Sequence, residues 1–236
     1  MLKVQNLKKR FGDFEAVKGI SFEVKQGEVL GFLGPNGAGK STTMRMITGF
    51  LPATSGSASI CGYDIATNPV EAKAALGYLP ESAPSYRAMT VEEYLKFIAE
   101  VRGLKVKDAV ENVIAKAKLE KVARQTIETL SKGYRQRTSF AAAIIHDPKV
   151  LIMDEPTDGL DPNQKFTVRE MIKEMSAEKA IVISTQILEE VDAVCTRAII
   201  IAGGELKADG TPAELKAKDP SGDLATVFRK LTMEAK

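Results

Sequence analysis

A glycine-rich segment directly after an apolar run constrains the fold of this 236-residue chain more than any other feature. The segment GPNGAGKST, from Gly34 to Thr42, matches the phosphate-binding pattern GxxxxGK[ST] and follows the run Val29–Leu33. In this pattern the glycines curl the backbone between a strand and a helix, so that N–H groups and the positive helix N-terminus face phosphate oxygens. The sequence therefore predicts a strand, a phosphate-binding loop and a helix that follows Lys40.

Further apolar runs predict an α/β core around this loop. Short runs rich in Val and Ile, bounded by Gly or polar residues, are typical of parallel strands that are buried on both faces. Helical patterns lie between them, as in βαβ units. The predicted strands are Val29–Leu33, Val150–Met153, Ile181–Ser184 and Ala198–Ala202, and the predicted helices include Gln164–Met175 and Leu188–Val194.

The rest of the chain predicts two additions to the core. Thr90–Val101 and Lys107–Ala123 have helical spacing, so residues 84–146 are expected to form an inserted helical lobe. Alternating apolar residues predict a small antiparallel β subdomain from Leu2–Val4, Phe22–Val24 and Ser57–Cys61. Apolar residues at helical spacing predict a C-terminal helix at about 222–236. We expect one domain over residues 1–236.

Composition and charge exclude several classes of protein. A net charge of +2 is too small for a broad cationic face, so nucleic acid is not an expected partner. The run Phe140–Ile145 is far shorter than a membrane-spanning helix, and the N-terminus lacks a signal-peptide pattern, which predicts a cytoplasmic protein. Cys61 and Cys195 are far apart and His146 is the only histidine, so neither a zinc cluster nor a disulfide is expected. Both thiols are predicted to be buried.

The phosphate-binding loop assigns roles to its polar residues. Lys40 is expected to reach the β- and γ-phosphates of ATP, and Ser41 is expected to ligate Mg²⁺. The predicted ATP-binding residues of the loop are Gly34, Pro35, Asn36, Gly37, Ala38, Gly39, Lys40, Ser41 and Thr42.

An apolar run that ends in two carboxylates predicts the second part of the site. In VLIMDEP, Asp154 and Glu155 follow the run at the sheet edge where phosphates bind. Asp154 is expected to hold Mg²⁺ through its water shell, and Glu155 is expected to orient and deprotonate the attacking water. Taken alone, such a pair also fits a helix N-cap or a solvated loop.

With these two motifs, the segment LSKGYRQR makes the chain resemble the ATP-binding subunit of an ABC transporter over nearly its whole length. The segment runs from Leu130 to Arg137, before the acidic run, and matches the family signature LSGGQ. The resemblance implies a P-loop NTPase with a RecA-like core, in which two ATPase domains pair head to tail around two ATP molecules. Ser131 and Gly133 would then contact the γ-phosphate held by the other subunit, while Ser131 by itself also fits a helix N-cap.

The resemblance implies roles for further residues. Phe11 stands where the family stacks an aromatic ring on adenine, although an aromatic in a β-rich segment also fits the core. Glu81, in GYLPE, stands where most members carry a glutamine that senses Mg²⁺ and water, and it is expected to contribute to the metal site. Asp161, in GLDPNQ, is expected to touch the opposing site. The motif sequences GYLPE, LSKGYRQR and LDPNQ resemble those of the gliding-motility and drug-export branch of the family.

One position departs from the family. In STQILEEVD, Gln186 stands where the family has a histidine. Its amide can donate a hydrogen bond to the γ-phosphate but cannot carry a positive charge, so ATP binding is expected to survive while hydrolysis is in question. His146 follows the signature helix and is expected to be a helix-terminus residue rather than a substitute. The expected catalytic residues are therefore Lys40, Glu155 and Gln186.

These observations and the resemblance predict an ATPase that drives a separate membrane permease from the inner face of the membrane, and the resemblance to the drug-export branch implies export. Its expected cofactors are ATP and Mg²⁺, and its expected partners are the permease and a second ATPase subunit, identical or different. One alternative is a hydrolysis-impaired regulatory or structural subunit of a heterodimer, which Gln186 favours. Another is an ATPase of the same family that acts on ribosomes or DNA, although the chain has neither a tandem domain nor the long inserted coiled coil of such proteins.

Overall fold

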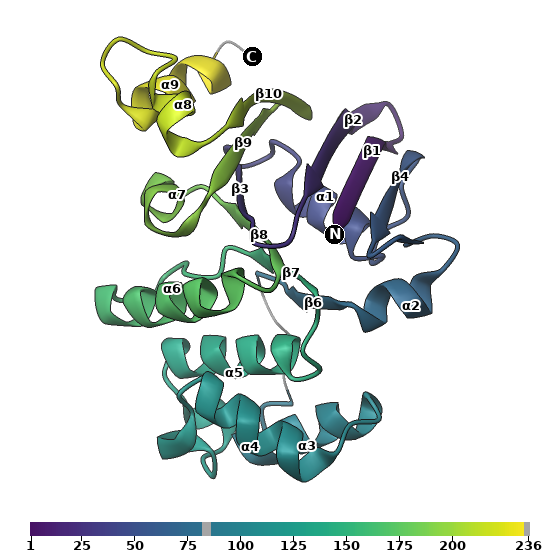
Figure 1. The fold of residues 1–236 in the computed structure, drawn as a ribbon, viewed down its shortest axis with the longest axis vertical. Helices are drawn as coiled ribbons and strands as arrows, with labels where there is room; N and C mark the ends of the chain where they lie inside the picture. The colour runs from purple at the N-terminus through teal and green to yellow at the C-terminus, as the bar shows by residue number, and fades with distance from the viewer. Residues whose placement is uncertain (82–85, 234–236) are drawn as a thin grey trace.

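Two sheets with helices packed around them form the structure, a computed structural model that describes residues 1–81 and 86–233 (Figure 1). The strands are β1 (Leu2–Phe11), β2 (Phe14–Val24), β3 (Val29–Leu33), β4 (Ser55–Ile60), β5 (Tyr63–Asp64), β6 (Leu76–Leu79), β7 (Val150–Asp154), β8 (Ala180–Thr185), β9 (Arg197–Ala202) and β10 (Glu205–Gly210). The helices are α1 (Lys40–Ile47), α2 (Pro69–Ala74), α3 (Val91–Val101), α4 (Val106–Lys116), α5 (Lys132–Ile144), α6 (Pro162–Ser176), α7 (Leu188–Val194), α8 (Pro212–Lys216) and α9 (Leu224–Met233), with 3₁₀ turns at Glu120–Val122 and Ile127–Thr129.

The larger sheet has the strand order β10-β9-β3-β8-β7-β6. Strand β3 pairs in parallel with β8 and β9, and β7 pairs in parallel with β6 and β8. Its register places Leu33 beside Thr185 and Asp154 beside Ser184. The carboxyl ends of β3, β7 and β8 therefore meet at one edge, where the phosphate-binding loop begins.

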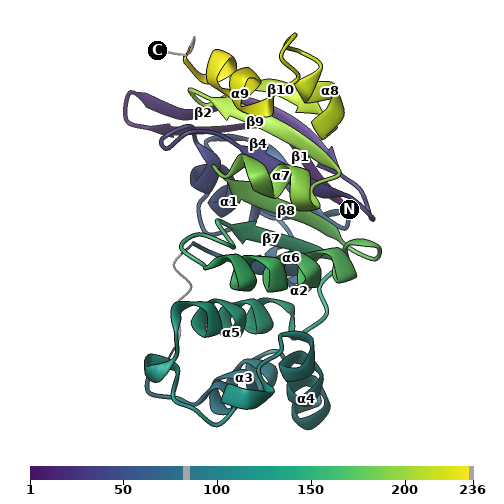
Figure 2. The same ribbon diagram turned by 90° about the vertical axis from the view of Figure 1, so that its left-hand side faces the viewer.

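Residues of the central strands alternate between two apolar cores, one on each face of the larger sheet. Leu151, Met153, Ile181 and Ile183 pack with helices α3 to α6. The residues that alternate with these along β7 and β8 point to the other face, where they pack with α1 and with the antiparallel sheet β2-β1-β4-β5. Figure 2 shows the outcome: α3, α4 and α5 form a layer at one end of the molecule, and α8 and α9 lie at the other.

The predicted helix Lys107–Ala123 is wrong at its C-terminal end. Helix α4 stops at Lys116, and Lys118 adopts a left-handed backbone with φ 53°. Lys118 N–H bonds to the carbonyl of Ala115, and Leu119 N–H bonds to that of Ile114, which is the hydrogen-bond pattern of a Schellman cap. The cap turns the chain so that Leu119 is fully buried.

The expectation of buried thiols is wrong for Cys61 and holds in part for Cys195, which packs against two apolar clusters. Cys61 is exposed, because Cys61 and Gly62 both adopt positive φ in the tight turn that joins β4 to β5. Cys195 is half-buried, with its Sγ 3.0 Å from where a Cβ on Gly31 would stand.

Two expected boundaries fall partly outside the described residues. Residue 84, where the helical lobe was expected to begin, and the last three residues of the expected helix at 222–236 are not described. Of the helices within 1–81 and 86–233, none has both the length and the apolar character needed to cross a bilayer.

Candidate active site at the sheet edge

The predicted phosphate-binding loop connects β3 to α1, as its spacing requires. Gly39 precedes α1 at φ 101°, and a Cβ there would stand 2.6 Å from the carbonyl oxygen of Ala16. A Cβ on Gly34 would stand 2.5 Å from the carbonyl oxygen of Ile201. Only glycine fits at these two points, which hold the loop against neighbouring strands.

Lys40 lies beneath this loop with 6% of its surface exposed. Its Nζ donates to the carbonyl of Gly34 at 2.7 Å and approaches that of Pro35 at 3.4 Å. The Glu155 carboxylate lies 3.9 Å from the same nitrogen. Burial lowers the pKa of Lys40, and the charges of Glu155, Asp154 and Glu81 oppose that shift. The ammonium is therefore held between the loop and the acidic strand end.

The two carboxylates at the end of β7 are both enclosed. Asp154 is 2% exposed, and its Oδ1 is buried without a hydrogen-bond partner among the described residues. The side chain of Glu155 is 10% exposed. The helix after them is capped by Asp161 instead, whose Oδ1 accepts from Gln164 N–H at 3.0 Å. The alternatives of an N-cap or a solvated loop are therefore wrong for this pair.

Strand β8 fixes the orientation of Glu155. The Glu155 N–H donates to the carbonyl of Ser184 at 2.8 Å, and Thr185 Oγ1 donates to Glu155 Oε2 at 3.3 Å. Burial raises the pKa of Glu155, while the charge of Lys40 and hydrogen bonds from the Gln186 backbone and Thr185 limit the rise. These bonds hold the carboxyl group in place. Its raised pKa gives it a higher affinity for protons, as a general base needs.

A cavity of about 280 Å³ opens beside the loop. Phe11 lines it at the tip of the β1–β2 hairpin and is 49% exposed, so the alternative that it belongs to the core is wrong. Phe14 also lines the cavity, and sequence analysis missed it. The signal is the spelling FGDF, because a two-residue turn at Gly12–Asp13 places the flanking residues opposite each other, as the register has them.

The signature segment lies away from that cavity. Ser131 caps α5, and its Oγ accepts from Tyr134 N–H at 3.4 Å, as the N-cap alternative predicts. A Cβ on Gly133 would stand 2.2 Å from the Gln164 side chain. Lys132 Nζ lies 3.5 Å from Asp158 Oδ2. Within one subunit, the segment therefore contacts the loop after the acidic strand, and neither Ser131 nor Gly133 lines the cavity beside Phe11.

Two predicted residues lie at the margin of the site. Glu81 is exposed beyond the end of β6, and its charge acts on Lys40. Gln186 is exposed immediately after β8, and its backbone bonds to Glu155. His146 lies elsewhere, two residues past α5, where its ring Nε2 is 2.9 Å from the carbonyl of Leu76. Burial lowers the pKa of His146 to about 4. The expectation of a helix-terminus residue is confirmed.

Comparison with known proteins decides the family. The sequence model of the family described as "ABC transporter" matches residues 17–158. The chain belongs to the ABC transporter family, as its ATP-binding subunit. The predicted fold class is confirmed, and this ABC ATPase carries the α/β core, the antiparallel sheet and the helical region of that family.

Several relatives resemble this ABC ATPase over most of its length. Linearmycin resistance ATP-binding protein LnrL of Bacillus subtilis is 41% identical over 91% of the chain and 70% of the relative. Nod factor export ATP-binding protein I of Ralstonia nicotianae is 34% identical over 97% of the chain and 72% of the relative. The probable multidrug ABC transporter ATP-binding protein YbhF of Escherichia coli is 36% identical over 94% of the chain, which spans 39% of that longer protein.

Solved structures share the fold of the ABC ATPase. An ATP-binding subunit of an ABC transporter superposes with a TM-score of 0.88 at 29% identity, covering 98% of this chain and 99% of the other. A second structure, an ATP-binding cassette solved as a dimer bound to ADP and Pi, superposes with a TM-score of 0.79 at 23% identity. It covers 89% of this chain and 98% of the other.

Proposed function

We propose that the chain hydrolyses MgATP at sites shared by two ATPase subunits and so drives an export permease. The observation that carries this proposal is the enclosed Glu155 carboxylate, held by Thr185 and facing Lys40 where the phosphate-binding loop begins. Export is inferred from relatives named for linearmycin resistance and Nod factor export.

The residues of the site support a hydrolytic mechanism. Lys40 exchanges its bonds to the carbonyls of Gly34 and Pro35 for bonds to the β- and γ-phosphate oxygens. Glu155 accepts a proton from the attacking water, because burial raises its pKa toward that task. Gln186 donates an amide hydrogen bond to the γ-phosphate. Phe11 and Phe14 offer ring faces to the adenine.

The donor set at the end of β7 fits Mg²⁺. The Oδ1 of Asp154 is a buried anionic oxygen without a partner among the described residues. Ser41, in the first turn of α1, offers a hydroxyl, and Glu81 offers a second carboxylate at the margin. Hard oxygen ligands of this kind, completed by phosphate and water, are those that Mg²⁺ prefers. When bound, the ion supplies positive charge to the β- and γ-phosphate oxygens.

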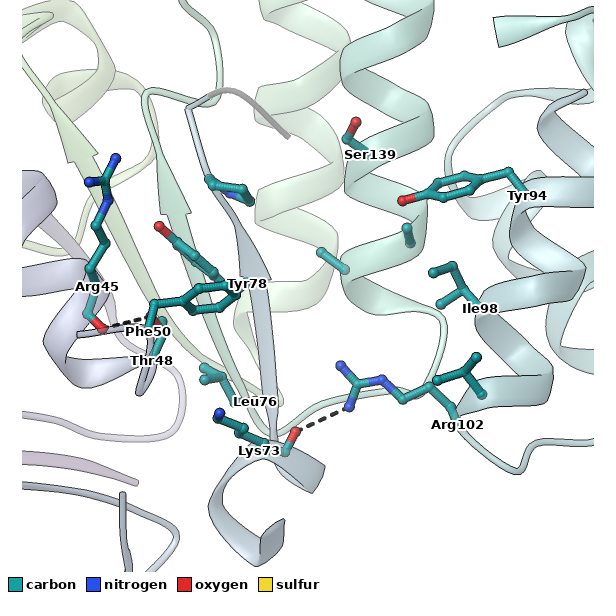
Figure 3. Close-up of a pocket in the computed structure, with 14 residues that line it drawn as sticks. Arg45, Thr48, Phe50, Lys73, Leu76, Tyr78, Tyr94, Ile98, Arg102 and Ser139 are labelled. Atoms are coloured by element: carbon teal, nitrogen blue, oxygen red, sulfur yellow. Dashed lines mark hydrogen bonds between the residues drawn. The ribbon is translucent and has the colours of Figure 1, made fainter. Parts of the chain in front are cut away.

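A groove beside the site supports permease docking (Figure 3). It has a volume of about 540 Å³ and lies between the end of α1, strand β6 and helices α3 and α5. Phe50, which is 72% exposed, packs on Tyr78 with ring centroids 5.4 Å apart. The strand that carries Tyr78 leads to Glu81. A partner seated here would therefore be in direct contact with the segment that leads to the metal site.

The charges of the groove indicate the chemistry of this partner. Arg45, Lys73 and Arg102 line it, and no carboxylate does among the described residues. Arg102 Nη1 is held by the carbonyl of Lys73 at 3.2 Å, which fixes one cation at the rim. We infer that a permease segment with apolar residues on one side and carboxylates at its ends occupies the groove.

A second candidate function follows from Gln186. If the amide cannot support turnover, the chain is the hydrolysis-impaired member of a heterodimer, which binds ATP and leaves the chemistry to its partner. Steady-state ATPase of the purified chain separates the two functions, because only the first predicts turnover without another ATPase subunit.

The decisive experiment uses Glu155→Gln. This variant keeps the shape of the carboxylate and removes the base, so it is expected to bind ATP, to lose turnover and to form a dimer with ATP and Mg²⁺. Light scattering coupled to size exclusion measures the dimer, and phosphate release measures turnover. Lys40→Ala is the control, because it removes charge-assisted hydrogen bonds to phosphate worth roughly 1.5–3 kcal/mol each and is expected to abolish the shift. A Glu155→Gln variant that stays monomeric at saturating ATP contradicts a composite site built from two copies.

A further inference from the structure

A fully buried carboxylate lies outside the groups that the mechanism uses. Glu190, in the first turn of α7, is 0% exposed. Its Oε1 accepts from Arg169 of α6 twice, from Nε at 3.1 Å and from Nη2 at 2.5 Å. Its Oε2 is buried and has no hydrogen-bond partner among the described residues. Among the described residues, the side-chain hydrogen bonds to the Glu190 carboxylate therefore come from Arg169.

A buried carboxylate is unfavourable unless it is paired. Arg169 meets that requirement, and the hydrogen bonds to Glu190 raise the pKa of the guanidinium. The pair joins two helices that each begin within two residues of a position to which the sequence assigns a role. Helix α6 starts directly after Asp161, and α7 starts two residues after Gln186.

Helix α7 depends on such contacts for its position. It has seven residues and no side-chain hydrogen bond at its N-cap, Ile187, so it is too short to be stable by itself. Glu190 lies four residues after Gln186, in the first turn of α7. Ile187 N–H donates to Thr185 Oγ1 at 3.0 Å, and Thr185 in turn donates to Glu155. The start of α7 is thus connected to the proposed base through two hydrogen bonds.

We propose that Arg169 and Glu190 are positioning residues that fix the start of α7 on α6 and thereby hold Gln186 and Thr185 in register with Glu155. The inference rests on the proposed function for its effect on hydrolysis. Neither residue lines the cavity beside the phosphate-binding loop. Their contribution is to keep the segment after β8 in one place, so that the amide of Gln186 meets the γ-phosphate.

The first test is Glu190→Gln, which keeps the side-chain shape and removes its charge, while Arg169 retains access to solvent. A small misplacement of Gln186 is expected to lower kcat about tenfold or more, with the ATP dissociation constant unchanged within about twofold. In a Gln186→Ala background, Glu190→Gln is expected to cause no further loss, because the two changes remove the same contact. Glu170→Gln is the matched control, since Glu170 pairs on the exposed side of α6 with Lys173 at 3.3 Å.

The second test measures directly whether the segment of residues 186–190 is held in place. Amide hydrogen exchange of residues 186–190 is expected to accelerate in Glu190→Gln and in Arg169→Gln, and to remain unchanged in the control. Arg169→Gln leaves a buried charge unpaired, so its thermal midpoint is expected to fall below that of the Arg169→Gln, Glu190→Gln double variant. A merely structural pair would not lower kcat at constant ATP affinity.

The outcomes separate the two proposals. Unchanged exchange at residues 186–190 in Glu190→Gln overturns the positioning role, as does an equal loss of kcat with and without Gln186. If Gln186→Ala alone leaves turnover unaltered, the proposed role of Gln186 fails, and the exchange rates still decide whether the ion pair positions the segment.

Discussion

Glu155 adopts a backbone conformation that few residues other than glycine accept, with φ 49°. Its N–H bonds to the carbonyl of Ser184, so the chain turns away from β7 while still paired to β8. Strain of this kind persists only where neighbouring contacts enforce it, and it is common at functional sites. At the scale of single residues, the proposed base is therefore placed by its backbone as well as by Thr185.

The pKa of Glu155 predicts how turnover depends on pH. Because burial raises this pKa and the base must be deprotonated, turnover is expected to fall as pH decreases, with a midpoint above the ordinary glutamate value of about 4.3. Thr185→Val removes a hydrogen bond that lowers the pKa, so it is expected to move this acid limb to higher pH. Thr185→Ser keeps the hydroxyl and is the control. The profile of kcat against pH is the measurement, and identical limbs in Val and Ser variants contradict the assignment.

Gln186 predicts a variant that gains activity. A histidine there can meet the developing charge of the γ-phosphate with a charged donor, and a hydrogen bond to a charged group is worth roughly 1.5–3 kcal/mol. Gln186→His is therefore expected to raise kcat by about tenfold to a hundredfold with little change in ATP affinity. Gln186→Ala tests the competing idea that the amide already acts. A rate in Gln186→His no higher than in the unsubstituted chain refutes the prediction.

At the scale of elements, α5 combines a structural and a proposed functional role at one residue. Removing the N-cap in Ser131→Ala is expected to reduce the free energy of unfolding by about 1 kcal/mol. Ser131→Asn keeps the cap and is expected to restore stability, yet it replaces the hydroxyl proposed to contact ATP in the other subunit. Urea denaturation of the nucleotide-free chain measures the first effect, and ATP-dependent dimerisation in a Glu155→Gln background measures the second. If Ser131→Asn dimerises with ATP as well as the chain that keeps Ser131, the proposed contact between Ser131 and ATP of the other subunit is contradicted.

The elements that sequence analysis predicted are those whose own residues determine them. Strands β3, β7 and β8 are continuous apolar runs, so their burial on both faces follows from composition. The end of α4 could not be predicted, because Lys118 takes a left-handed backbone that usually requires glycine, and the burial of Leu119 compensates. The Arg169–Glu190 pair could not be predicted either, since two helices distant in sequence must meet before it exists.

The candidate site likewise contains residues that local motifs predicted and features that depend on contacts distant in sequence. The phosphate-binding loop and the acidic pair were found because both motifs lie within a few residues. Phe14 was missed, although its pairing with Phe11 follows from the turn between them. The left-handed backbone of Glu155 depends on pairing with the neighbouring strand β8, and the Oδ1 of Asp154, which has no hydrogen-bond partner among the described residues, likewise has no local signal.

At the scale of the whole molecule, the groove predicts a separation of function between docking and catalysis. Arg102→Glu reverses one fixed charge at the rim and is expected to reduce co-purification of the membrane permease at least several-fold, while ATP binding by the isolated chain stays unchanged. Lys96→Glu reverses an exposed charge on α3, the helix that ends just before Arg102, and serves as the control, since Lys96 pairs with Glu92 at 2.6 Å. Equal recovery of permease with both variants contradicts docking at the groove.

The strand order of the larger sheet determines when this molecule can acquire its ligand during synthesis. Strand β3, which carries the phosphate-binding loop, has β8 and β9 as its two neighbours, so its hydrogen bonds wait for residues 180–202 to be made. Pairing over such a separation is slow, and until it occurs an apolar strand remains exposed to aggregation. We therefore expect ATP to stabilise the nascent chain only after residues 180–202 have been made, late in its translation.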